Sequence, residues 1–137
     1  MIHNLLATMR HHPRCVGLAA PQVGSSLCIA VMDSSRNPNA SESRGTLVLV
    51  NPELVDAGGG SIQREGCLSI PDFTGNVRRA TRVVVRARDE AGHRYETILE
   101  GFEAIVAQHE IDHLHGTLFL DRVTNLATDV FRRKTYY

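Results

Sequence analysis

Residues 101–116 read GFEAIVAQHEIDHLHG, and this stretch decides the fold. Apolar side chains and two histidines recur there at the spacing of one helical face: Phe102, Ile105, Val106, His109 and His113. The spacing predicts a helix of about fourteen residues, roughly 21 Å long, with that face turned inward. Gly116 is suited to end it as a C-terminal cap. We therefore predict that this helix forms the centre of the fold.

The segments around this helix predict mainly short strands. Strands are expected at Leu27–Met32, Thr46–Val50, Glu53–Ala57, Arg78–Arg88 and Tyr95–Leu99, with a break at Asn51-Pro52 and turns at Gly58-Gly59-Gly60 and Asp89–Gly92. Two further helices are expected at Met1–His11, closed by Pro13, and at Asn125–Lys134, and a surface loop at Ser34–Arg44. We predict one α+β domain over residues 1–137, with mostly antiparallel sheets packed around the central helix.

Composition narrows the class of protein. In 137 residues, 15 basic side chains balance 15 acidic ones, so no global charge draws the chain to nucleic acid or to an anionic membrane. The three cysteines are an odd number at irregular spacing, unlike the disulfide framework of a small secreted domain. The first twelve residues are too polar for a signal-peptide core. We therefore expect a cytosolic protein with reduced thiols.

The motif His109-Glu110-Ile111-Asp112-His113 points to metal chemistry. Two imidazoles one helical turn apart can hold a single ion, with a carboxylate beside them. This arrangement is typical of metal-assisted hydrolysis, in which an ion activates water and a carboxylate moves its proton. From the helix alone, two hydrogen-bonded core histidines remain an alternative. His115 lies on another face of the helix and is expected to act as a charge near its C-terminus.

A catalytic metal of this kind needs a third protein ligand. Cys67, in the stretch Glu65-Gly66-Cys67-Leu68-Ser69, is the candidate, and with the two histidines it would suit iron(II) or zinc. The alternative is that Cys67 is a small buried apolar side chain. Cys28 lies in an apolar segment and is assigned to the core.

Three stretches together resemble the peptide deformylases. They are VGLAAPQ (16–22), EGCLS (65–69) and QHEIDHL (108–114), and they occur in the order of that family. The resemblance extends from about His11 to Asp121. It implies a hydrolase that removes the N-formyl group from the initiator methionine of new bacterial or organellar polypeptides.

The resemblance also implies roles for single residues. Cys67, His109 and His113 would hold Fe²⁺, with Zn²⁺, Ni²⁺ or Co²⁺ as substitutes. Glu110 would take a proton from water and deliver one to the leaving amine. The side-chain amide of Gln22 and the backbone N–H of Leu68 would stabilise the charge that develops on the formyl oxygen.

The substrate contacts follow from the same likeness. The methionine side chain would lie among Val16, Phe102, Ile105 and Val106, which could equally be plain core residues. Gly17 would let the peptide backbone approach closely and pair like an edge strand. Arg79 would contact the peptide further out, unless it belongs to a solvated strand face.

The chain departs from the family pattern in two ways. Cys15 stands where the family usually has glycine, which adds bulk at the rim of the substrate groove. Family members also generally carry a further N-terminal segment, so we expect a homodimer that covers apolar surface near residues 1–12.

Other functions stay open at this point. One is hydrolysis of another formylated amine, another is a zinc peptidase, and a third is a weakly active binding protein with the same fold. The expected partners are formylmethionyl peptides, including nascent chains at the ribosome, with no membrane and no direct nucleic acid contact.

Overall fold

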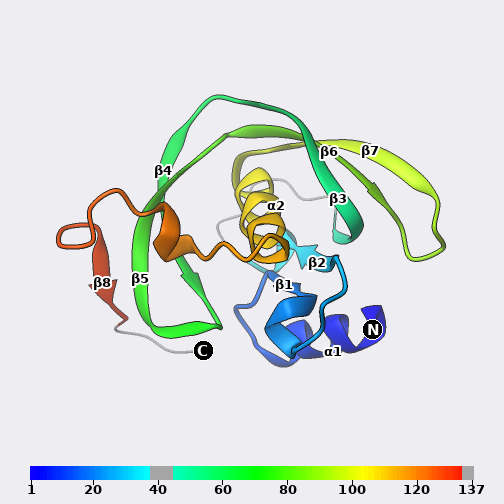
Figure 1. Ribbon diagram of the computed structural model, residues 1–137, viewed down its shortest axis with the longest axis horizontal. Helices are drawn as coiled ribbons and strands as arrows, with labels where there is room; N and C mark the ends of the chain where they lie inside the picture. Colours follow the sequence, from blue (N-terminus) through cyan, green and yellow to red (C-terminus); the bar gives the residue numbers. More distant parts are fainter. Residues whose placement is uncertain (38–44, 134–137) are drawn as a thin grey trace.

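The computed structural model describes residues 1–37 and 45–133. Helix α2 (Gly101–Leu114) lies at the centre, and two antiparallel sheets curve around it (Figure 1). Nine of its residues are buried, on every side of the helix: Glu103, Ala104, Ile105, Val106, Ala107, Glu110, Ile111, Asp112 and His113. The α+β fold and the central helix are confirmed. The prediction of a single inward face was too narrow, because the sheets enclose the helix.

The larger sheet has the strand order β1-β2-β3-β6-β7. Its strands are β1 (Gly17–Ala19), β2 (Ile29–Asp33), β3 (Thr46–Gly58), β6 (Arg82–Arg88) and β7 (Arg94–Glu100). Alternate side chains, among them Val83, Val85 and Leu99, are fully buried and belong to one core cluster with Val106 and Ile111 of α2. This sheet therefore forms the main core of the protein.

The smaller sheet brings the cysteine motif to α2. It has the order β4-β5-β8, with β4 (Ser61–Cys67), β5 (Ile70–Arg79) and β8 (Val130–Arg132). A two-residue turn, Leu68–Ser69, joins β4 to β5. Cys67, at the end of β4, is buried in a cluster with Val77 and with Phe119 of a short 3-10 helix (Phe119–Arg122).

Two predicted elements are wrong. The helix expected at Asn125–Lys134 is a turn followed by β8, which pairs with β5 through Thr74 and Phe131 among others. Pairing with β5 outweighed the local helical pattern. Lys134, the last residue of the predicted helix, lies outside the described residues. The strand expected over Arg78–Arg88 is divided between β5 and β6 at residues 80–81, so Arg78 and Arg79 belong to the smaller sheet.

The break expected at Asn51-Pro52 is a bulge within one strand. The register of β3 against β6 shifts between Val50 and Glu53, and Asn51 has a φ of 50°. In the loop expected over Ser34–Arg44, residues 34–36 form a 3-10 turn with Ser34 fully buried, and residues 38–44 lie outside the described part.

Helix α1 (Ile2–His11) forms as predicted, beginning one residue later than expected, and covers a second core cluster. Leu5 and Met9 are fully buried there against Leu18 and Val31. Within residues 1–12, the exposed large apolar side chain is Met1. The apolar surface that motivated the homodimer is thus covered by the chain itself, and the dimer stays a prediction.

No helix in residues 1–37 or 45–133 has the length and apolar character needed to cross a membrane.

Two leucines of β3 test the assignment of the core. Leu49 is fully buried, whereas Leu54 is 43% exposed. We expect Leu49→Ala to lower the free energy of unfolding by about 2–5 kcal/mol, through lost burial and a cavity. The same substitution at Leu54 should cost less than about 1 kcal/mol. Urea unfolding of both variants measures this, and equal losses would contradict the assignment.

Candidate metal centre

Three predicted ligands converge between the smaller sheet and α2. The ligand atoms of Cys67, His109 and His113 all lie within 4.8 Å of one another. The Cys67 Sγ lies 3.2 Å from Nε2 of His113, which lies 3.1 Å from Nε2 of His109. One helical turn brings the two imidazoles together, and the end of β4 adds the sulfur.

The charges of this cluster favour metal binding. Burial alone would raise the pKa of the Cys67 thiol, but hydrogen bonds with His109 and His113 lower it to about 5. Burial would lower the pKa of His109, but hydrogen bonds with Cys67 and Glu65 raise it to about 10. Cys67 is therefore a thiolate at neutral pH, the form that binds metals. A cation entering the cluster would replace the proton on His109.

The spacing of the donors also fits an ion. Tetrahedral bonds of about 2.0–2.3 Å put neighbouring nitrogen and sulfur ligands roughly 3.4–3.6 Å apart. The two separations that involve His113, 3.1 and 3.2 Å, need to widen by only a few tenths of an ångström, and the third pair, Cys67 and His109, lies within 4.8 Å. One thiolate and two imidazoles form a set that suits iron, zinc, nickel or cobalt.

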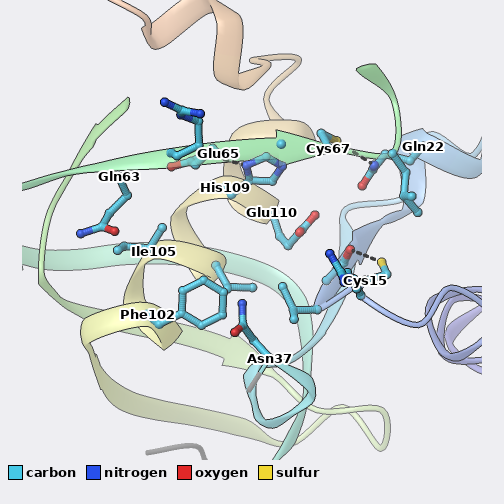
Figure 2. A pocket seen from close by; sticks show the side chains of 17 residues that line it. Cys15, Gln22, Asn37, Gln63, Glu65, Cys67, Phe102, Ile105, His109 and Glu110 are labelled. Carbon is cyan, nitrogen blue, oxygen red and sulfur yellow. Dashed lines mark hydrogen bonds and ion pairs between the residues drawn. The ribbon is translucent and has the colours of Figure 1, made fainter. Parts of the chain in front are cut away.

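Glu65 orients one of these ligands. Its Oε1 lies 2.8 Å from Nδ1 of His109, which leaves Nε2 to face the cluster (Figure 2). Burial raises the pKa of Glu65, but Arg79 and His109 outweigh this effect and hold it below its usual value. The carboxylate is thus ionised and holds the imidazole in one orientation.

Glu110 lies beside the cluster in a confined position. The residue is 4% exposed, and its Oε1 is buried with no hydrogen-bond partner among the described residues. Burial raises the pKa of its carboxyl to about 7, and the neighbouring histidines offset only part of this effect. On the other side it packs against Gly17, where an added Cβ would lie 2.9 Å from Cδ of Glu110. Glycine at residue 17 therefore makes room for this carboxylate.

A cavity of about 230 Å³ opens over the cluster. Cys67, His109 and Glu110 line it together with five predicted substrate residues: Val16, Gly17, Phe102, Ile105 and Val106. Figure 2 shows Phe102 and Ile105 of α2 on one side of Glu110, and Cys15 on the other. The part of the cavity lined by Val16, Phe102, Ile105 and Val106, which we call the apolar pocket, thus adjoins the ligand cluster.

Comparisons with known proteins point to one family. The family profile described as polypeptide deformylase matches residues 1–129. A peptide deformylase from Halothermothrix orenii is 42% identical over 130 residues, which cover 95% of this chain and 80% of that protein. The chain belongs to this family.

Solved structures agree with this membership. The peptide deformylase from Thermotoga maritima is 38% identical, with a TM-score of 0.81 over 90% of this chain and 79% of that one. A class I type b peptide deformylase from Acinetobacter baumannii, with Met-Ala-Ser bound, is 39% identical, with a TM-score of 0.80 over 87% of this chain and 76% of that one.

The two residues that the deformylase likeness assigns to oxyanion stabilisation both lie at the cluster. Gln22 accepts a hydrogen bond from the N–H of Ala19, so its amide NH₂ faces the cluster. That NH₂ donates to Cys67 Sγ at 3.3 Å and to Ser69 Oγ at 3.1 Å. Leu68 lines the cavity from the turn between β4 and β5.

Arg79 has a different place from the one predicted. Its side chain is 3% exposed and does not line the cavity. It donates two hydrogen bonds to Glu65, at 2.7 and 2.9 Å, and one to Asp112, at 2.5 Å. Neither peptide contact nor a solvated strand face is compatible with this position. Arg79 shares the inward face of β5 with the fully buried Val77, two residues earlier, and this alternation could have placed it.

The roles of Glu65 and Asp112 were missed, although both lie in the quoted motifs. Asp112 pairs with both Arg79 and Arg122. Arg122 donates hydrogen bonds of 2.6 and 2.8 Å to the two carboxylate oxygens of Asp112. Cys15 is buried and donates its S–H to the carbonyl of Gly17. Cys28 is half-buried just before β2, so its assignment to the core holds only in part.

Two arginines that bind Asp112 test the energetic role of this network. Arg79→Ala would leave Glu65 and Asp112 buried without their shared partner, and we expect a loss of about 3–5 kcal/mol in unfolding free energy. Arg122 is 48% exposed, so Arg122→Ala should cost no more than about 1 kcal/mol. Denaturant unfolding of the two variants measures both losses in unfolding free energy. A larger loss for Arg122→Ala than for Arg79→Ala would refute the prediction.

Proposed function

We propose that this deformylase removes the N-formyl group from the initiator methionine of newly made polypeptides. One observation carries the proposal: the partnerless Oε1 of Glu110 belongs to a carboxyl group beside the Cys67, His109 and His113 cluster, and Glu110 lines the same cavity as Cys67 and His109. A buried carboxylate oxygen without a partner costs free energy, which a water or a substrate there would offset.

Cys67, His109 and His113 would hold the ion, and we propose Fe²⁺, with Zn²⁺, Ni²⁺ and Co²⁺ as substitutes. Bound there, a divalent cation would supply Lewis-acid chemistry for the hydrolysis of the formyl amide. Glu65 supports this role, because it holds His109 in the orientation that presents Nε2.

Glu110 is the proposed proton carrier. Its carboxylate takes a proton from the attacking water and passes it to the amine that leaves as the formyl C–N bond breaks. The carboxylate packs against Gly17 of β1, where a side chain would displace it. The Gln22 NH₂ and the Leu68 N–H stabilise the negative charge on the formyl oxygen, and each such donor typically contributes about 10²–10³ in rate.

The apolar pocket would hold the methionine side chain. Phe102, Ile105 and Val106 come from the first half of α2, and Val16 comes from the segment before β1. Beyond the pocket, β1 and β4 are edge strands within the described sheets, so an extended peptide could pair with either edge. The Met-Ala-Ser bound to the Acinetobacter relative supports a peptide of this kind as the ligand here.

The cellular setting follows from this substrate. We propose that the chain acts as a single domain on nascent chains at the ribosome, in the bacterial cytoplasm or in an organelle. Homodimer formation is a separate proposal, which the mass of the protein in solution tests.

Release of formate tests the proposed reaction. The protein, purified anaerobically with Fe²⁺, should release formate from formyl-Met-Ala-Ser and leave the acetylated analogue intact. Glu110→Gln should lower kcat by about 10²–10⁴, because the proton carrier is lost. Glu90→Gln, which removes an exposed carboxylate in the turn after β6, should leave kcat unchanged. Formate release that Glu110→Gln leaves intact would refute the role of Glu110, and no formate from the wild type would refute the function.

A further inference from the structure

The basic residues that line the cavity are exposed, whereas the acidic ones are buried. Two exposed arginines line it, Arg14 from the segment before β1 and Arg64 from β4. Its two acidic lining residues, Glu65 and Glu110, are both buried, and Glu65 is already paired with Arg79 and His109. Among the residues that the structure describes, the accessible charge lining this cavity is therefore positive.

The backbone on both sides of Arg14 is held in place by Arg36. Nη1 of Arg36 donates to the carbonyl of Cys15 at 2.7 Å and to that of Met9 at 2.6 Å. Nη2 donates to the carbonyl of His12 at 3.1 Å. The N–H of Cys15 also donates to the carbonyl of His12, so the turn carrying Arg14 is closed and anchored. Arg14 is thus presented from a fixed backbone.

The two arginines differ in how their guanidinium groups are engaged. The guanidinium of Arg64 lies 3.7 Å from the centre of the Phe131 ring, a cation–π contact. Arg14 is exposed and forms no ion pair within residues 1–37 and 45–133. The Arg64 guanidinium is therefore held against Phe131, whereas the Arg14 guanidinium is not held in this way and is available to a ligand in the cavity.

We infer that Arg14 is a specificity-determining residue that selects formylmethionyl peptides with acidic side chains directly after the methionine. The inference rests on the proposed function. Arg14 lies two residues before Val16, the proposed methionine contact, so their Cα atoms are at most about 7.6 Å apart. An extended peptide advances about 3.3 Å per residue, so a peptide that runs from the pocket toward the segment before β1 brings its next two side chains within reach of the arginine.

The size of the preference follows from the exposure of Arg14. Exposed ion pairs are weak, so two carboxylates should raise kcat/KM by roughly threefold to tenfold at low salt. Screening should reduce the difference as ionic strength rises, because the Debye length falls to about 3 Å at 1 M salt.

C-terminally amidated peptides give the cleanest test, because a free terminal carboxylate would itself attract Arg14. Formate release is compared for formyl-Met-Glu-Glu-amide, its Gln-Gln isostere and its Lys-Lys counterpart, at low and high salt. The wild type should prefer them in that order. Arg14→Gln should abolish the difference between the first two, and Arg14→Glu should reverse the order. Arg94→Gln, which removes an exposed arginine of β7 outside the cavity, should retain the wild-type preference.

Equal kcat/KM for the Glu-Glu and Gln-Gln peptides in the wild type would overturn the inference. A preference that survives in Arg14→Gln would overturn it as well. If no formylated peptide is hydrolysed, the proposed function fails, and calorimetric binding of Met-Glu-Glu-amide against Met-Gln-Gln-amide then tests Arg14 by itself. Tighter binding of the acidic peptide, lost in Arg14→Gln, would support the inference, and equal binding would refute it.

Discussion

The buried ion pairs of Arg79 are the constraint on which the metal centre depends. A guanidinium that is 3% exposed is costly unless its charge is matched, and Glu65 and Asp112 match it from β4 and α2. Because Arg79 lies on β5, the three residues tie both long strands of the smaller sheet to the central helix. Cys67 follows Glu65 by two residues, so the same contacts bring its sulfur to His109 and His113.

The central helix and the cluster of three candidate ligands could be predicted because their signals are local. Helical spacing predicts that the residues from Phe102 to His113 on one face belong to a single helix. Cys67 could be proposed as the third ligand because a thiolate is a good metal ligand. The pairing of Arg79 with Asp112 could not be predicted in this way. The two residues are 33 positions apart, and no local pattern around either of them indicates the other. The extent to which the sheets enclose α2 could not be predicted either. Even the acidic residues Glu103 and Asp112 of this helix are buried.

The other differences have the same origin in long-range packing. Residues 130–132 form a strand because β5 offers an edge, which a local pattern does not reveal. Gly17 was expected to admit a peptide backbone, and the structure adds a second reason for glycine in the packing of Glu110 against it. Glycine at residue 17 therefore suits both proposals, because a side chain there would collide with the Glu110 carboxylate, the proposed proton carrier, and would stand at the proposed substrate edge.

X-ray absorption at the metal edge of the iron- or cobalt-loaded protein tests the centre most directly. We expect one sulfur at about 2.3 Å and two imidazole nitrogens at about 2.0–2.1 Å from the ion, and loss of the sulfur signal in Cys67→Ser but not in Cys28→Ser. An ion surrounded by nitrogen and oxygen alone in the wild type would contradict the assignment of Cys67, His109 and His113 as its ligands.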